Sequence, residues 1–205
     1  MRIFSLLIAV FCAAPAYGQI PMDLNTQDLR LIQHIDEHIN SQKTMQSRFV
    51  QLDGGGGFLE GTVSWRRPDQ ARFDYDPPSP LLLIASGTFL IEVDRELEQV
   101  THYPQIGSIA DYLLAEDMLQ NPELAISSLD IGVKVINIGV FERDAPENGI
   151  IVLSFDAKTF DLERWTINSP DGAHTAVNLI APEFNLDLED KIFHFRKPKE
   201  WELQR

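Results

Sequence analysis

Cysteine is almost absent from this chain of 205 residues, and its scarcity limits how the fold is stabilised. Cys12 is the only cysteine, and it lies in an apolar run near the N-terminus. Phe11 precedes it, whereas lipid attachment at a cysteine requires a small residue there, so lipidation is not expected. Removal of the run would leave no cysteine and therefore no disulfide. A domain of this length can bury enough core to fold without one.

Long hydrophobic runs are also missing, apart from Ile3 to Ala14 at the N-terminus. That run is too short to span a bilayer, which argues against the alternative of an anchor helix. It follows Arg2 and ends in small residues, the plan of a secretory signal peptide, with cleavage after Ala16 or Gly18. The sequence therefore predicts a signal peptide at residues 1–18 and one exported domain at 19–205.

Basic residues are scarce: 17 Lys+Arg stand against 31 Asp+Glu, a net charge of −14. Loss of Arg2 with the signal peptide would make it about −15. Such a surface repels nucleic acid and anionic membranes. We expect an exported protein that binds no nucleic acid.

The chain after the signal peptide begins with an amphipathic helix. Asn25 or Thr26 can cap it, and its pattern continues to about Ser41. One face is apolar, and the other is predicted to be solvated; the polar face carries Arg30, Gln33, Asp36 and Glu37.

From Thr44 onward, short alternating segments joined by turns predict an antiparallel sheet. Residues 109–129 favour two short helices instead, and strands then resume, ending with "KIFHFRKP". The fold class is therefore mainly β with helices, a strongly curved antiparallel sheet in one domain. The concave side of such a sheet must be filled with side chains, covered by helices, or hold a ligand. The 12 phenylalanines suit a filled core.

Catalytic and metal-binding motifs are not evident. His34 and His38 have the i, i+4 spacing of a zinc site, but Ile35 stands where HExxH needs Glu, and no third ligand is suggested. The run from Gly54 to Gly57 precedes a strand rather than a helix, so it is interpreted as a hairpin loop. We expect no enzyme, no metal and no cofactor.

Arg67 is the unusual residue of the "SWRRPDQARFDY" stretch. Alternation places it on the same apolar face as Val63 and Trp65, and Pro68 favours extended backbone at Arg67. Two interpretations remain open. The guanidinium extends to solvent at the end of the strand, or its donors bind acceptors on a helix that covers the sheet.

Several motifs, in order, resemble the LolA family of periplasmic carriers of outer-membrane lipoproteins. They are "SRFVQL", "GTVSWRRPDQARFDYDPP", "LLLIASGTFLIEVDRELEQVT", "LERWTINSPDGAHTAVNL" and "KIFHFRKP", within residues 29–198. The resemblance implies an unclosed β-barrel covered by a helical lid. It also assigns to Arg67, which precedes Pro68, the role of a latch that hydrogen-bonds to the lid.

The same resemblance implies a periplasmic, monomeric carrier that shields the acyl chains of lipoproteins between the inner and outer membranes. Its implied partners are an ATP-driven releasing complex in the inner membrane and an acceptor lipoprotein in the outer membrane. Strand alternation selects candidates for the lipid cavity: Phe49, Leu59, Val63, Trp65, Phe73 and Phe89. The alternatives are a carrier of free lipid, glycolipid or another amphiphile, and a non-catalytic sensor or interaction module whose cavity is filled.

Overall fold

The structure is a computed structural model, and it describes residues 19–202. The predicted signal peptide, residues 1–18, lies outside the described residues. Among the described residues, no helix is long and apolar enough to cross a membrane.

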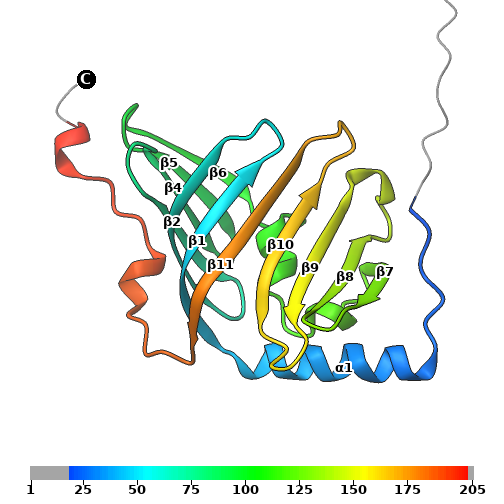
Figure 1. Ribbon diagram of the computed structural model, residues 1–205. Helices are drawn as coiled ribbons and strands as arrows, with labels where there is room; N and C mark the ends of the chain where they lie inside the picture. Colours follow the sequence, from blue (N-terminus) through cyan, green and yellow to red (C-terminus); the bar gives the residue numbers. More distant parts are fainter. Residues whose placement is uncertain (1–18, 203–205) are drawn as a thin grey trace, which may run out of the picture.

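A single antiparallel sheet of eleven strands forms the body of the protein (Figure 1). The strands are β1 (Thr44–Asp53), β2 (Phe58–Arg66), β3 (Gln70–Tyr75), β4 (Leu81–Ser86), β5 (Phe89–Asp94), β6 (Gln99–Pro104), β7 (Leu124–Ile131), β8 (Val135–Glu142), β9 (Ile150–Asp156), β10 (Leu162–Asn168) and β11 (His174–Phe184). Their order is β6-β5-β4-β3-β2-β1-β11-β10-β9-β8-β7, so β6 and β7 are the two edges and do not pair with each other. This arrangement confirms the predicted curved, unclosed sheet.

The first helix, α1 (Thr26–Ser41), begins and ends where the sequence predicts. Asn25 caps it by accepting from the backbone N–H groups of Gln27 and Asp28 at 2.8 and 3.0 Å, and the Asp28 carboxylate accepts in return from Asn25 N. Such a cap contributes about 1 kcal/mol. Ile32, Ile35 and Ile39 are buried, and α1 runs across one end of the sheet (Figure 1).

The predicted helical insertion is only half correct. Residues 109–120 do form a helix, α2 (Ile109–Leu114), and a 3₁₀ turn, η1 (Met118–Gln120). Residues 124–131, however, form the edge strand β7, paired with β8. The Asn121 side chain accepts from Glu123 N at 2.9 Å and makes a turn where a helix start was expected. A bulge between Ile126 and Ser128 then breaks the alternation by which a strand is recognised.

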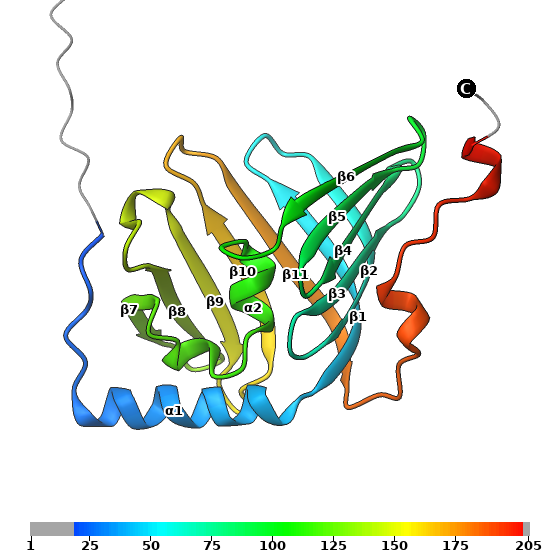
Figure 2. The same cartoon turned by 180° about the vertical axis from the view of Figure 1, so that it is seen from behind.

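The helix α2 lies against the concave side of the sheet, where Figure 2 shows it in front of the strands. Tyr112, Leu113 and Leu114 are buried there. Residues 105–120, which hold α2 and η1, are called the lid segment below.

The C-terminal strap, residues 186–202, covers part of the convex side. The predicted last strand is wrong, because "KIFHFRKP" forms the 3₁₀ turn η3 (Asp190–Phe193) followed by irregular chain, and η4 (Lys199–Glu202) comes after it. Phe195 and Trp201 pack on a separate apolar cluster of Leu82, Ile84 and Val93. Leu82, Ile84 and Val93 are therefore buried under the strap and not in the concave core.

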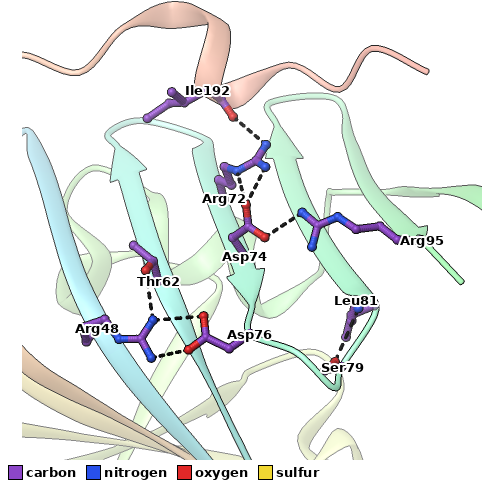
Figure 3. Close-up of polar contacts among 9 residues, drawn as sticks. All are labelled: Arg48, Thr62, Arg72, Asp74, Asp76, Ser79, Leu81, Arg95 and Ile192. Carbon is purple, nitrogen blue, oxygen red and sulfur yellow. Dashed lines mark hydrogen bonds and ion pairs between the residues drawn. The ribbon is translucent and has the colours of Figure 1, made fainter. Parts of the chain in front are cut away.

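Polar groups fix the strap to the strands (Figure 3). Arg72 donates to the carbonyl oxygen of Ile192 at 3.2 Å and to the carboxylate of Asp74 at 2.6 Å. Arg66 binds Asp190 and lies over the ring of Phe193 at 5.0 Å. Arg66 therefore faces the convex side, as the alternation of β2 predicts.

Candidate functional site

An apolar cavity of about 240 Å³ lies on the concave side, between the sheet and the first residues of α2. Aromatic and aliphatic side chains form most of its wall, and those used below are Phe73, Tyr75, Leu83 and Leu90 of β3–β5, Trp165 and Ile167 of β10, Val177 of β11, and Ile109 and Ala110 of α2. Pockets for drug-sized ligands usually have about 300–1,000 Å³. This cavity is smaller than that range, so a drug-sized ligand would fit only if α2 moved.

Two buried polar side chains hold the ends of the lid segment. At its start, Gln105 donates to the carbonyl oxygen of Asp69 at 2.8 Å and accepts from Gly87 N at 2.9 Å. At its end, the fully buried carboxylate of Asp36 accepts from Leu119 N at 2.8 Å and from Gln120 Nε2 at 2.9 Å. The ends of the lid segment are thus bound to the sheet turns and to α1, while α2 between them has fewer polar ties.

Arg67 contacts the middle of the lid segment. Its side chain is only 5% exposed, and Nη1 donates to the carbonyl oxygen of Ala115, the C-cap residue of α2, at 2.9 Å. The guanidinium also lies over the Trp65 ring, 5.6 Å from its centre. β2 ends at Arg66, but Arg67 N still donates to Lys43 O at 2.8 Å, so the strand pairing continues to Arg67. Among residues 19–202, no acceptor is present for the buried donors Nε and Nη2.

The electrostatics show that the closed lid holds Arg67 at a cost. Burial lowers the pKa of the guanidinium to about 10 from its ordinary 12.5, and the Asp36 carboxylate opposes this effect. Arg67 is therefore still charged at neutral pH. A shift of that size corresponds to about 3 kcal/mol against the charged form relative to water. The one hydrogen bond to Ala115 and the aromatic contact with Trp65 therefore leave the charged guanidinium incompletely compensated.

The cavity candidates chosen from the sequence are placed in three different ways. Phe73 lines the cavity. Phe49, Val63 and Trp65 are buried in the same core but do not line it. Phe49 supports the wall, because its ring packs edge-on against Phe73 and Tyr75 at 5.6 and 5.1 Å between ring centres.

The other two candidates lie away from the cavity. Leu59 belongs to the concave side by alternation but sits near the β1–β2 turn and is 37% exposed. Phe89 is on the convex side and is 44% exposed, with its ring edge-on to His102. The β4–β5 register pairs Ala85 with Leu90, so it is Leu90 that faces the cavity.

Sequence reasoning missed most of the cavity wall. Trp165 and Ile167 are two apart on β10, and the same alternation that selected Phe73 could have found them. Tyr75 follows Phe73 by the same spacing, and its hydroxyl donates to Gln51 Oε1 at 2.6 Å. Burial raises the pKa of Tyr75 to about 12, so the hydroxyl stays neutral in the cavity.

The histidines of α1 have structural contacts. The His34 ring packs edge-on against Phe160, and His38 Nε2 lies 2.8 Å from Asp161 Oδ1. Within the described range, no three His, Cys, Asp or Glu side chains are grouped to hold a metal ion.

Comparisons with known proteins agree with this architecture. The profile of the family described as outer membrane lipoprotein carrier protein LolA matches residues 40–196. An uncharacterised protein of Rickettsia prowazekii is 24% identical over 171 residues, which cover 81% of this chain and 78% of that protein. An outer-membrane lipoprotein carrier protein of Alkalilimnicola ehrlichii is 27% identical over 173 residues, covering 76% of this chain and 75% of the relative.

A solved structure shows the same fold. The crystal structure of an uncharacterised conserved protein from Thermus thermophilus superposes with a TM-score of 0.51 at 11% identity. The match covers 82% of this chain and 94% of that one. The family profile spans residues 40–196, which is most of the chain. The chain therefore belongs to the LolA family of outer membrane lipoprotein carrier proteins.

Proposed function

We propose that this protein carries acylated lipoproteins through the periplasm, from the inner to the outer membrane, with their acyl chains shielded on the concave side of the sheet. The observation that carries the proposal is the apolar cavity beneath a lid segment whose middle is held by Arg67. An acyl chain of a dozen methylenes costs roughly 10 kcal/mol to expose to water. A carrier removes that cost only if α2 moves aside, because the cavity in the closed form is small.

Release is the other half of the task. When α2 lifts, Arg67 loses the Ala115 carbonyl and faces acyl chains, which offer no acceptor. The loaded form is thereby less favourable by one charge-assisted hydrogen bond, about 1.5–3 kcal/mol. We therefore assign Arg67 the role of keeping affinity low enough for transfer to an acceptor lipoprotein in the outer membrane. The donor would be an ATP-driven complex in the inner membrane.

The test is to purify the protein from the periplasm without detergent and to identify bound molecules by mass spectrometry. Acylated protein on the carrier supports the proposal. Free lipid or glycolipid alone would favour the alternative, a carrier of free lipid. A single acyl chain of such a lipid could also enter the 240 Å³ cavity. An empty protein that displaces no hydrophobic dye would indicate an interaction module with a filled core.

The cavity can be tested by substituting, in separate variants, two neighbouring residues that face opposite sides of the sheet. We expect Leu90→Asp to weaken binding of a fluorescent hydrophobic dye at least about tenfold, because a carboxylate in an apolar cavity is costly. Phe89→Asp is the matched control, since Phe89 is on the convex side, and its dye affinity should stay within about twofold. Leu90→Trp, which fills the cavity without adding charge, should also weaken binding. Equal dye affinity in all four proteins would contradict the assignment of this cavity.

A further inference from the structure

A second cavity lies on the other side of α2 from the first. It has about 140 Å³ and is bounded by β7, β8, β9, β10 and the lid segment. Ile109 of α2 and Ile167 of β10 line both cavities. The two spaces are therefore neighbours, separated where the first residue of α2 lies over the sheet. If α2 moved away from the sheet, Ile109 would no longer separate the two cavities.

The second cavity differs from the first in having a carboxylate in its wall. Glu142, at the end of β8, lies among Ile109, Leu124 and Ile151. It follows Val140 by two residues, so alternation places it on the concave side. Its Oε2 accepts from Asn148 Nδ2 at 2.7 Å, and its Oε1 accepts from the hydroxyl of Tyr112 on α2. Within residues 19–202, Glu142 has no ion-pair partner.

Tyr112 is a neutral donor carried by the lid segment. Its side chain is buried. Burial is the larger cause, and the hydrogen bond to Glu142 the next, of the raised pKa of the Tyr112 hydroxyl. When α2 lifts, this donor leaves and Asn148, which belongs to the sheet side, stays. Glu142 would then be a carboxylate with one free oxygen, facing the space that the Tyr112 hydroxyl had left.

We infer that the second cavity is the head-group subsite of the amphiphile site, and that Glu142 selects cargo with an N–H donor, an ammonium or an amide, beside its acyl chains. The inference rests on the proposed function, since it requires an amphiphile in the first cavity. In the closed form the Tyr112 hydroxyl occupies the position of that donor. Cargo and lid segment thus compete for the same carboxylate oxygen.

The size of the effect follows from the chemistry of the bond. A hydrogen bond from a cationic donor to a carboxylate contributes about 1.5–3 kcal/mol, equivalent to roughly 10- to 100-fold in affinity. A quaternary ammonium has the same charge but no N–H, so it gains only the weaker long-range attraction. An anionic head group is repelled by Glu142.

The experiment is displacement of a hydrophobic dye by three amphiphiles of equal chain length below their micelle concentrations: dodecylamine, dodecyltrimethylammonium and dodecyl sulfate. In the unmodified protein dodecylamine should bind most tightly. Glu142→Gln should weaken dodecylamine at least about tenfold and dodecyltrimethylammonium by less than about threefold. Glu147→Gln, which removes an equal charge from an exposed position in η2 (Pro146–Asn148), is the matched control and should change neither.

A second variant is expected to change amphiphile affinity in the opposite direction. Tyr112→Phe removes the lid's hold on Glu142, so all three amphiphiles should bind several-fold more tightly, with the preference for dodecylamine retained. The inference is overturned if Glu142→Gln binds dodecylamine like the unmodified protein, or if Glu147→Gln weakens it equally. If no amphiphile displaces the dye from the unmodified protein, the proposed function itself fails, and the inference with it.

Discussion

Arg67→Leu is expected to bind lipoprotein about 10- to 100-fold more tightly than the unmodified protein and to transfer it correspondingly more slowly. In the closed form Arg67 has one acceptor, the carbonyl oxygen of Ala115, and an aromatic neighbour in Trp65. In the proposed loaded form, the Ala115 carbonyl moves away with α2. Leucine removes the charge that the loaded form would have to hold beside acyl chains. The free energy of loading should therefore improve by the value of one charge-assisted hydrogen bond.

Folding should be little affected by this change. The pKa of about 10 shows that the site disfavours the charged guanidinium, and two of its donors have no acceptor among the described residues. Replacing buried charged groups with well-packed apolar side chains of similar volume is often neutral or stabilising. We expect the free energy of unfolding of Arg67→Leu to lie within about 1 kcal/mol of the unmodified value or above it. Thermal melting followed by circular dichroism measures this.

Transfer is measured by loading the carrier with an acylated lipoprotein and following its movement to acceptor-containing vesicles. Arg66→Leu is the matched control, because Arg66 is adjacent, has the same charge and faces the C-terminal strap. It should lower stability by a small amount and leave the transfer rate unchanged. Transfer by Arg67→Leu at the unmodified rate would show that the contact with Ala115 does not control release.

The parts of the fold that follow local patterns could be predicted from the sequence. The helix α1 has a complete cap at Asn25 and three buried isoleucines at helical spacing, and these signals do not depend on the rest of the chain. The hairpin of β4 and β5 turns at Gly87, whose φ of +87° favours glycine. Arg67 was found because a charge on an apolar face requires an explanation.

Phe89 shows what local pattern cannot decide. Phe89, Ile91 and Val93 form the apolar side of β5; Ile91 and Val93 are covered, whereas Phe89 stays 44% exposed. The cover is the C-terminal strap, with Phe195 and Trp201, and not the lid segment. Each side of β5 is partly covered by a segment outside the strand, so the pattern does not identify which side faces the cavity. Leu90, on the other side of the strand, lines the cavity.

Asp36 is a second instance, and the sequence places it on the solvated face of α1. The structure buries it completely, against the backbone of η1. Its partners, Leu119 N and Gln120, come from a segment more than 80 residues away, and the local pattern of α1 does not predict them. Glu142 and Tyr112 were missed for the same reason, since their contact exists only after the lid segment has folded onto β8.

Asp36→Ala is expected to be the most destabilising single change considered for this protein. It leaves Leu119 N and the Gln120 amide without their acceptor in the interior, and it removes the anion that favours the charged form of Arg67. Breaking a buried charged network by removing one partner costs about 3–5 kcal/mol. For a domain of this size, the melting temperature should fall by on the order of 10 °C. Urea unfolding followed by circular dichroism measures the free energy directly.

Two further proteins separate this explanation from a general loss of helix stability. Glu37→Ala, at the next position of α1, removes an exposed carboxylate whose bond to Gln33 is also exposed, and should change stability by less than about 0.5 kcal/mol. The double variant Asp36→Ala with Arg67→Leu should be more stable than the sum of the single changes by about 0.5–3 kcal/mol, because leucine no longer needs a neighbouring anion. Strict additivity would show that Asp36 acts only on η1. In that case α1 holds the end of the lid segment independently of the residue that holds its middle.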